Sequence, residues 1–504
     1  MQSNTAIALP PDLAQCHALL IELNAILAEK QRRESQLEQQ LELLLKRLYG
    51  PKSERIDPSQ LVMFGQETNA GPQPETAVEE QAPASAPAKK NGHGRKPLPQ
   101  DLPRKRIVHD VADEQKTCPE CSAHKSRIGE DVREQLEYVP ASLYVLEHVY
   151  PKYACPKCQE HVCQAKASPR VIEKGLPGPG LVAHVITSKY CDHLPLYRQE
   201  RILARHGVEL SRTTLCGWVL KAANKLAPLV DAMQREVLAS RVIHTDDTPV
   251  RVQGDEEGAF TGRLWVYVGD LEHPYTVYDY TSSRRRDGPA KFLDGYQGYL
   301  QADAFGGYDG IYATGKVIEC ACWAHARRKF HEARSSDSGR ALRMLAWIRQ
   351  LYEVEREAKH LDSEKRRAIR VEKSKPLLDA IKAWLDGQQR DTLPKSPIGA
   401  AIGYALNHWA ALVRYLDDGI IAIDNNAAEQ ALRGIAIGRK NWLFLGSDNG
   451  GRAAATLYSL IQGAKRHGLD PHAYLRDILL RVTAQPSPDL RELLPDRWKA
   501  AHQS

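Results

Sequence analysis

A regular seam of apolar residues runs through the first 48 positions of the chain. Within a helix predicted for residues 11–48, steps of three and four residues alternate along Leu20, Leu23, Leu27, Lys30, Glu34, Leu37, Leu41, Leu44 and Leu48. This spacing is typical of a coiled coil. Because no other apolar segment lies nearby to cover the stripe, we predict that residues 1–65 form a leucine-zipper-like helix through which the chain self-associates. An amphipathic helix packed on its own domain is the alternative.

The segment that follows has no periodicity. Residues 66–107 are rich in Pro, Ala, Glu and Gln, and they end in the basic sequence KKNGHGRKPLPQDLPRKR. This composition predicts a disordered linker. Its basic end suits either a contact with phosphate groups or a solvated tether, and the sequence does not separate the two.

Apolar and polar positions in the second half of the chain predict a mixed sheet with flanking helices. Strand patterns cover residues 240–252, 262–270, 275–283, 297–304 and 316–322, and a helical pattern covers 323–333. Residues 338–416 have an all-helical composition with a break near DTLPKSPIG. Two further helices are expected, one ended by Gly468 and one started by Asp470-Pro471. The fold class predicted is therefore multidomain α+β, with a helical insertion in the sheet domain.

Residues 180–225 have the periodicity of a helix-turn-helix. The first helix is expected to end near His206-Gly207, and Ser211 is expected to cap a second helix. The first residues of that second helix, Arg212, Thr213 and Thr214, could reach base edges or phosphates of DNA. We predict a DNA-binding motif here, although an ordinary pair of packed helices gives the same pattern.

Two Cys-x-x-Cys pairs precede this motif. TCPEC contains Cys118 and Cys121, and YACPKC contains Cys155 and Cys158. Four thiolates from two such turns can bind Zn²⁺ tetrahedrally, which predicts a structural zinc ribbon. Unrelated reduced cysteines are the alternative, and His161 and Cys163 are less regular substitutes as ligands.

Acidic residues lie where two predicted strands end and where a later helix begins. VIHTDDTPV leads into Asp246, Asp247 and a Thr-Pro stop, and GYLQADAFGGYDG leads into Asp303. The helix that follows DNN places Glu429 in its first turn. Carboxylates from three separate segments suit hard divalent cations. The alternatives are turn residues at the strand ends, and a capping pair of Asn426 with Glu429.

Cationic residues surround this region. Arg433, Arg439 and Lys440 follow Glu429, and we expect them beside the phosphates of a bound strand. The run of arginines at 284–286 suits either a phosphate contact or a solvated loop, and we favour the solvated loop.

Cys322 and His325 are spaced to share one face of a helix start. Zinc binding by these two residues would need two more ligands, so we prefer a structural pair or a DNA contact by His325.

Composition adds little to this picture. The chain has 504 residues and a formal charge of +6, which is compatible with a nucleic-acid partner. No apolar run approaches the roughly 18 residues that a membrane span needs, and the N-terminus lacks the pattern of an export signal. We therefore expect a cytoplasmic protein with no membrane partner, and ten cysteines that serve as thiols and metal ligands.

The order HTDDTPV, GYLQADAFGGYDG, CWAHARRKF, DNNAAEQALRGIAIGRKNWLFLGS and LYSLIQGAKRHGLDPHAYLRDIL resembles the insertion-sequence-sixty-six family of bacterial DDE transposases. The match covers nearly the whole chain. The resemblance implies a ribonuclease-H-like core whose catalytic triad is Asp246, Asp303 and Glu429. Many relatives have Asp-Glu-Thr-Pro where this chain has Asp-Asp-Thr-Pro, and we take Asp246, not Asp247, as the first ligand. Small accessory proteins encoded by the same element are also implied.

The predicted reaction is phosphoryl transfer on DNA. Mg²⁺ (or Mn²⁺) held by the three acids would support cleavage at element ends and strand transfer into target DNA. The alternatives are a nuclease of the same fold that cuts without joining, and a zinc-ribbon and helix-turn-helix regulator without catalysis. The domains predicted after the linker are a zinc ribbon (108–175), a helix-turn-helix (176–235), a first core part (236–335), a helical insertion (336–416), the rest of the core with C-terminal helices (417–485) and a tail (486–504).

Overall fold

The computed structural model describes the main part of the chain and short pieces of its N-terminal third. The described residues are 12, 17–18, 20–27, 29–34, 37, 143–146, 148, 152–153, 163–164, 169–173, 175–254, 258–484 and 489–502. The chain divides into one compact unit formed by Met1–Lys52 with Tyr150–Ser504 and a second formed by Ser53–Val149. The four cysteines of the predicted zinc ribbon and residues 66–107 lie outside the described residues. Near the ribbon, the structure describes two short antiparallel strands, β1 (Lys152–Tyr153) and β2 (Cys163–Gln164).

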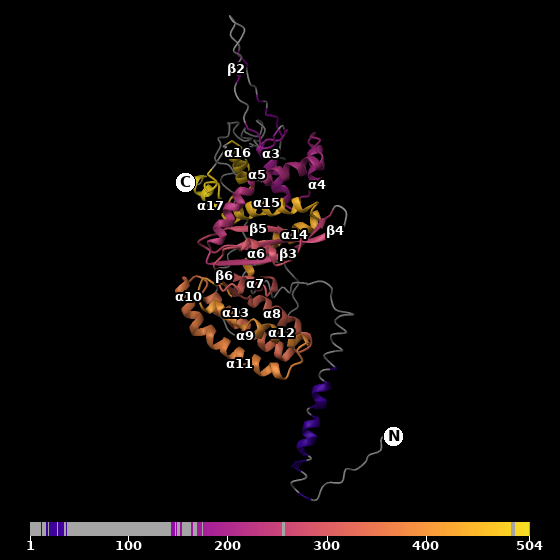
Figure 1. The fold of residues 1–504 in the computed structure, drawn as a ribbon, viewed down its shortest axis with the longest axis vertical. Coiled ribbons are helices and arrows are strands. Elements are labelled where there is room, and N and C mark those ends of the chain that lie inside the picture. Colours follow the sequence, from indigo (N-terminus) through magenta and orange to yellow (C-terminus); the bar gives the residue numbers. More distant parts are fainter. Residues whose placement is uncertain are drawn as a thin grey trace, which may run out of the picture. The chain divides into compact units, whose positions relative to one another are not determined.

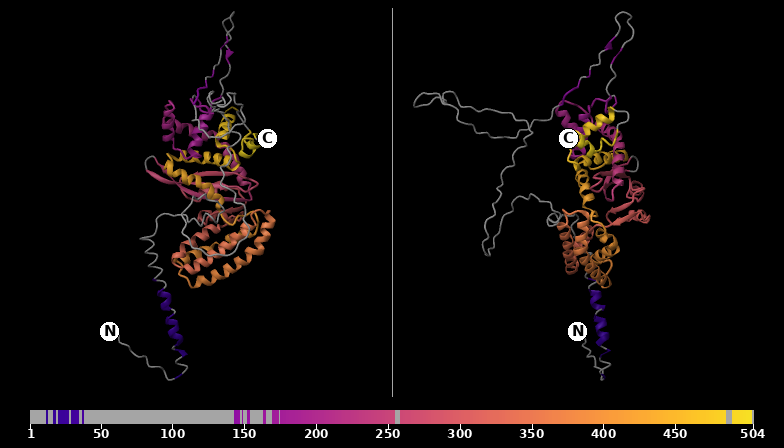
Figure 2. Two further views of the ribbon diagram at one scale, coloured as in Figure 1. Left: turned by 180° about the vertical axis from the view of Figure 1, so that it is seen from behind. Right: turned by 90° about the vertical axis from the view of Figure 1, so that its left-hand side faces the viewer.

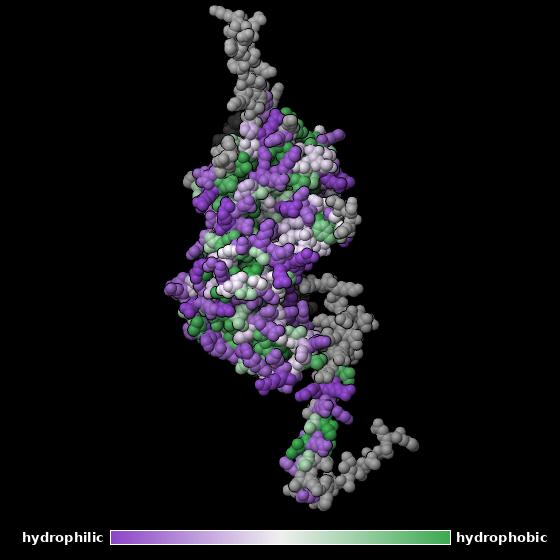
Figure 3. Space-filling view, viewed as in Figure 1, coloured by the Kyte–Doolittle hydropathy of each residue, from purple (hydrophilic) through white to green (hydrophobic). Residues whose placement is uncertain are grey.

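The described residues between 17 and 37 are helical, and a bend at residue 12 precedes them. Of their seam leucines, Leu20, Leu27 and Leu37 are more than half exposed in the single chain and Leu23 is 44% exposed, and green apolar residues are visible on this helix in Figure 3. The predicted helix is thus confirmed over this segment. Self-association through it stays a prediction.

A five-stranded mixed sheet forms the centre of the main unit. Its order is β5-β4-β3-β6-β7; β4 is antiparallel to its two neighbours, β3 and β5, and β6 and β7 are parallel to β3. The strands are β3 (Val242–Gln253), β4 (Ala259–Val268), β5 (Thr276–Thr281), β6 (Gly298–Gln301) and β7 (Val317–Cys320). Each predicted strand is therefore confirmed.

One detail of β3 was predicted wrongly. The Thr248-Pro249 pair does not stop the strand, because β3 continues to Gln253 and pairs with β4 up to that residue. On its other side β3 pairs with β6 only from Val242 to His244. Proline lacks an N–H, and it is tolerated in a strand where the neighbouring edge is unpaired.

The helices divide into two groups on either side of the sheet (Figure 1), and the views in Figure 2 show the same division. Near the sheet and its N-terminal bundle lie α3 (Pro179–Tyr190), α4 (Leu196–Arg205), α5 (Arg212–Leu238), α6 (Asp287–Phe292), α7 (Asp309–Tyr312), α14 (Asn426–Trp442), α15 (Asp448–Arg466), α16 (Pro471–Ala484) and α17 (Pro495–His502). The insertion comprises α8 (Trp323–Glu332), α9 (Ser338–Glu357), α10 (Ser363–Ile369), α11 (Lys375–Arg390), α12 (Pro397–Asn407) and α13 (Trp409–Val413).

The insertion has a hydrophobic core of its own. Met344, Ile348, Ile381 and Ile402 are fully or almost fully buried within it. The predicted break near DTLPKSPIG lies between α11 and α12. Backbone hydrogen bonds from Ala321 N to Ala411 O and from Trp323 N to Ile423 O join the insertion to the end of β7. The all-helical character predicted for this segment is confirmed.

The C-terminal helices also follow the prediction. Gly468, with φ +71, ends α15, and Asp470 accepts a hydrogen bond from Ala473 N at the start of α16. α15 packs on β5 and α5, and α16 packs on α3. Among the described residues, no helix has the length and apolar character needed to cross a membrane. The domain boundaries given above stay predictions.

Candidate active site at the junction of β3, β6 and α14

Asp246 and Asp303 lie where β3 and β6 separate. The last paired residues of these parallel strands are His244 and Gln301. Asp246 and Asp303 each follow two residues after this last pair, and the charge of Asp303 acts on the Asp246 carboxyl. Asp246 is an inner residue of β3, whereas Asp303 is two residues beyond the end of β6. The sheet therefore brings two acids that are distant in sequence to the place where β3 and β6 stop pairing, which we call the opening.

Asn425 attaches the start of α14 at the same opening. Its side-chain amide is fully buried; Nδ2 donates to Thr245 O at 2.8 Å, and Oδ1 lies 3.2 Å from His244 Nδ1. Both partners belong to β3, at the end of its pairing with β6 or just beyond it. Because Glu429 is in the first turn of α14, this anchor brings a third acid to the opening.

The capping alternative for Glu429 is wrong. The N-cap of α14 is Asn425, not Asn426, and Glu429 Oε1 is buried without a hydrogen-bond partner in the described structure. Asp424 satisfies the helix start instead, because it accepts hydrogen bonds from the backbone N and the side chain of Asn426. The Glu429 carboxylate is thus left available for another role.

The three acids influence one another electrostatically. Burial raises the pKa of the Asp246 carboxyl to about 7, and the nearby charges of Asp303, Asp247 and Glu429 contribute to this rise, against a hydrogen bond from Asp247 N that lowers it. Burial also raises the pKa of Asp303, while Arg284 lowers it. A group of carboxyls that repel one another is stabilised by a cation.

Asp247 points away from this group. Adjacent residues of a strand face opposite sides of a sheet, so Asp246 faces the α14 side and Asp247 faces the other. The Asp247 side chain is almost fully buried and forms ion pairs of 2.8 Å with both Arg263 and Arg284. Its charge is already neutralised, which supports Asp246 as the residue available to a metal.

Arg284 is exposed, as expected for the run of arginines, but it is not only solvated. Its guanidinium contacts Asp247 at 2.8 Å and Asp303 at 3.4 Å, and it lies 4.0 Å from the centre of the Phe305 ring. No local pattern in the sequence distinguishes it, because Arg285 and Arg286 beside it have the same charge and all three residues are exposed. Arg284 links the two faces of the opening.

A second set of donors surrounds Glu429. Cys322 is the N-cap of α8, and His325 follows it on the same helix. One ligand atom of each of these residues and one oxygen of Glu429 all lie within 4.8 Å of one another. Within the described part of the chain, Asp246 and Asp303 lie outside this close group. The predicted pairing of Cys322 with His325 therefore has a third member, which sequence spacing could not reveal.

A divalent cation fits the opening on two observations. The Glu429 Oε1 atom is buried and has no hydrogen-bond partner in the described structure, and Asp246 lies among like charges. Oxygen ligands of this kind are those that Mg²⁺ and Mn²⁺ prefer. Asp246, Asp303 and Glu429 are the residues that could hold such ions.

The predicted cationic residues differ in their surroundings. Arg433 and Lys440 lie on α14 at least partly exposed, whereas Arg439 Nη1 donates to Thr248 Oγ1 and Pro249 O, both at 2.8 Å. Arg439 therefore holds α14 against β3.

The helix ends predicted between residues 196 and 214 are confirmed, whereas a DNA-binding role of the helix pair stays a prediction. α4 ends at His206 with Gly207 at φ +77, and Ser211 Oγ accepts a hydrogen bond from Thr214 N. Arg212, Thr213 and Thr214 are exposed at the start of α5. Trp218, in contrast, is buried in the core and is not available to a ligand.

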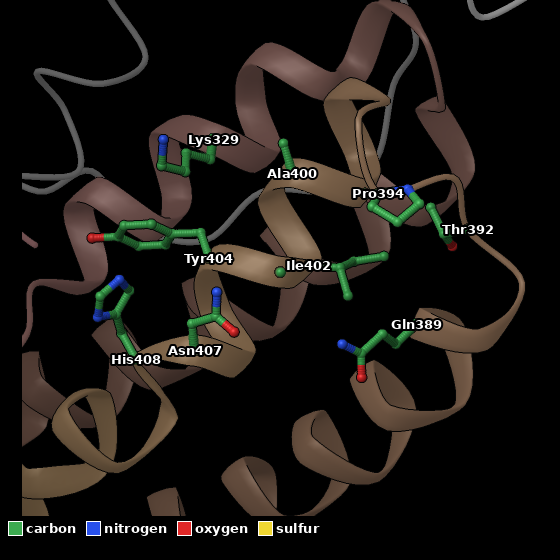
Figure 4. Close-up of a pocket in the computed structure, with 11 residues that line it drawn as sticks. Lys329, Gln389, Thr392, Pro394, Ala400, Ile402, Tyr404, Asn407 and His408 are labelled. Atoms are coloured by element: carbon green, nitrogen blue, oxygen red, sulfur yellow. The ribbon is translucent and has the colours of Figure 1, made fainter.

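A pocket of about 480 Å³ lies in the insertion, between α8, α11 and α12 (Figure 4). Lys329 Nζ lies 4.9 Å from the centre of the Tyr404 ring, and the rings of Tyr404 and His408 are 4.8 Å apart. Burial raises the pKa of Tyr404. Lys329 is one helical turn beyond His325 on α8.

Comparison with known proteins gives consistent matches along the chain. Residues 174–453 match the model of the transposase IS66 family, 115–159 match the zinc-finger binding domain of transposase IS66, 36–107 match the transposase C of IS166 homeodomain, and 459–495 match the IS66 C-terminal element. The second match includes all four cysteines of the predicted ribbon.

Two relatives come from Sinorhizobium fredii (strain NBRC 101917 / NGR234). The uncharacterized protein y4hP is 36% identical over 81% of this chain and 77% of its own length. The uncharacterized protein y4qI is 32% identical over 97% of this chain and 93% of its own length. Since the family model alone covers more than half of the residues, the chain belongs to the transposase IS66 family.

Proposed function

We propose that this protein is a DNA transposase that cuts DNA at insertion-sequence ends and transfers the freed strand to target DNA. The observation that carries the proposal is the approach of Asp246, Asp303 and Glu429 to one opening from β3, β6 and α14. The order and directions of the five strands support a ribonuclease-H-like core. Family membership supports DNA as the partner.

In this proposal the acids hold two divalent cations, Mg²⁺ or Mn²⁺. Such ions supply an activated nucleophile and neutralise charge on the scissile phosphate. The chain's own residues would position them: Asn425 holds α14 at β3, and the Arg284 contacts keep Asp247 neutralised and Asp303 in place. Arg433 and Lys440 would contact phosphates of the bound strand, and His325 would lie beside it.

Other parts would serve binding and assembly. Cys118, Cys121, Cys155 and Cys158 would hold a structural Zn²⁺, which agrees with the zinc-finger match over residues 115–159. The N-terminal helix would join copies of the chain. Small accessory proteins from the same element remain proposed partners.

The test of catalysis uses end-sequence DNA and a supercoiled target. We expect wild-type protein to yield joined products with Mg²⁺ and none with EDTA, and Asp303→Asn to yield neither nicks nor joined products, because a carboxylate ligand is lost. Gel analysis of labelled strands measures both products. Nicks without joining would favour a nuclease. Specific binding without any metal-dependent product, in the presence of the accessory proteins, would favour a regulator.

The helix-turn-helix makes a separate prediction. Arg212→Ala should weaken binding to end DNA about tenfold and lower the slope of log affinity against log salt by about 1, as expected for one lost phosphate contact. Fluorescence anisotropy over a salt series measures both quantities. Arg235→Ala is the matched control, since Arg235 is exposed in the last turn of the same helix, about 35 Å away. Equal losses in the two variants would favour an ordinary helical pair.

A further inference from the structure

The starts of two helices meet beside Glu429. Cys322 is the N-cap of α8 and Asn425 is the N-cap of α14, and Asn425 N donates a hydrogen bond of 3.2 Å to Cys322 Sγ. His325 lies three residues after Cys322, and Glu429 lies in the first turn of α14. A thiol, an imidazole and a carboxylate are therefore held together by rigid elements. The positive ends of both helix dipoles favour negatively charged ligand groups at this place.

The donor atoms have the spacing of a metal site. All three lie within 4.8 Å of one another, and His325 Nε2 is 3.8 Å from Glu429 Oε1. Zinc bonds of about 2.0–2.3 Å in tetrahedral geometry separate neighbouring donors by roughly 3.4–3.8 Å. A small adjustment of these side chains would thus complete the coordination.

Two polar atoms at this place are unsatisfied. His325 Nδ1 and Glu429 Oε1 are buried, and in the described structure neither has a hydrogen-bond partner. Buried polar atoms are paired in most proteins, and an unpaired one commonly indicates a bound ion or water. Here the atoms without a hydrogen bond belong to two of the three potential ligands, and Glu429 Oε1 has only the 3.8 Å contact with the other ring nitrogen of His325.

We propose that Cys322, His325 and Glu429 bind one transition-metal ion that accepts sulfur and nitrogen ligands, with Zn²⁺ the best fit. Mg²⁺ takes oxygen ligands, whereas thiolate and imidazole favour Zn²⁺ and similar ions. Three protein ligands leave a fourth position open for water or a phosphate oxygen. Glu429 belongs both to the acids proposed to hold Mg²⁺ and to this new group of ligands, and its carboxylate has two oxygens to offer. The inference therefore deepens the proposed function, and its consequence for catalysis rests on that function.

The buried thiol does not oppose this assignment. In the metal-free protein, burial raises the pKa of Cys322 to about 12, so that the thiol is neutral. A metal ion deprotonates a coordinating thiol outright. Binding therefore replaces a proton on Cys322 by the ion.

The test measures metal content of the full chain without DNA. After dialysis against micromolar Zn²⁺, elemental analysis should find one more zinc ion per chain in wild type than in Cys322→Ser. Cys320→Ser is the matched control, since Cys320 is an equally buried thiol on β7 outside the donor group, and it should keep the wild-type content. In a second experiment, the additional zinc ion is selectively removed from the zinc-loaded protein and Co²⁺ is added. Wild type should then show a sulfur-to-cobalt charge-transfer band, and Cys322→Ser should lack it.

A second variant guards against loss of folding in Cys322→Ser. His325→Gln changes a partly exposed side chain and should weaken binding of the additional ion at least about a hundredfold, because even outer partners of metal ligands are worth 10–100-fold. Equal zinc content in wild type, Cys322→Ser and His325→Gln would overturn the inference. Wild-type protein that binds the additional ion but neither cuts nor joins DNA in the presence of the accessory proteins would overturn the proposed function and support the metal site.

Discussion

Asp246→Asn is expected to abolish metal-dependent DNA cleavage and, at the same time, to stabilise the metal-free protein above pH 7. The cleavage rate should fall at least about a hundredfold, since the change removes a proposed ligand and even outer partners of ligands are worth 10–100-fold. The gain in stability has a different cause. Asp246 is buried among Asp303, Asp247 and Glu429, and without a cation its charge is unfavourable in the folded state.

The pH dependence follows from the direction of this shift. The pKa of Asp246 is about 7 in the folded protein and about 4 in an unfolded chain. Between these values the folded state keeps a proton that the unfolded state releases, so the free energy of unfolding falls as pH rises through the window. Above pH 7 the charged Asp246 lowers the free energy of unfolding by its full amount, about 4 kcal/mol, because the pKa values of the folded and unfolded states differ by about three. The asparagine amide does not titrate, and the Asp246→Asn variant should lack this part of the slope.

The neighbouring residue is the control for this experiment. Asp247→Asn makes the same chemical change one position along, but it weakens the ion pairs with Arg263 and Arg284 and should destabilise the protein by about 2 kcal/mol or more. Urea unfolding at pH 5 and pH 8, with EDTA, measures both variants. Stabilisation by Asp247→Asn and destabilisation by Asp246→Asn would reverse the roles given to the two acids.

Local patterns explain why most elements were predictable. Alternation of apolar residues identified β3 to β7, and Gly207, Ser211 and Gly468 marked helix ends through backbone and capping preferences that act within a few residues. A helix or strand can be predicted from the sequence when its conformation depends on residues that are neighbours in the chain.

The errors concern contacts between distant residues. Asn425 is an N-cap whose side chain bonds β3, about 180 positions earlier in the chain, and Arg284 pairs with acids on two other segments. Pro249 was interpreted as a strand end, but β3 continues through it because its edge there is no longer paired with β6. Where β6 stops pairing cannot be seen from the residues around Pro249. The positions of the acids at strand ends predicted that they lie close together. The same positions could not predict that Cys322 and His325 lie beside Glu429, or that arginines neutralise Asp247.

Arg370→Leu is expected to destabilise the insertion by about 3–5 kcal/mol, the usual cost of removing one partner of a buried ion pair. The Arg370 side chain is 1% exposed; Nε and Nη2 donate to Glu355 at 2.7 Å each, and Nη1 donates to Tyr415 O at 2.7 Å. Leucine would leave the Glu355 carboxylate and this carbonyl without their donor. Urea unfolding followed by circular dichroism measures the loss.

Two further variants separate the buried pair from a general effect of charge. Lys373→Leu alters the same turn of helix, but its partner Glu357 is half exposed, so loss of this solvent-screened pair should change the free energy of unfolding far less than loss of the buried one. Arg370→Leu combined with Glu355→Leu should recover much of the stability, because no buried charge then lacks a partner. If Arg370→Leu cost no more than Lys373→Leu, the pair would not hold the insertion together. A confirmed loss would identify Arg370 as the residue that fixes the segment leading to Asp424, and through it the start of α14 that carries Glu429.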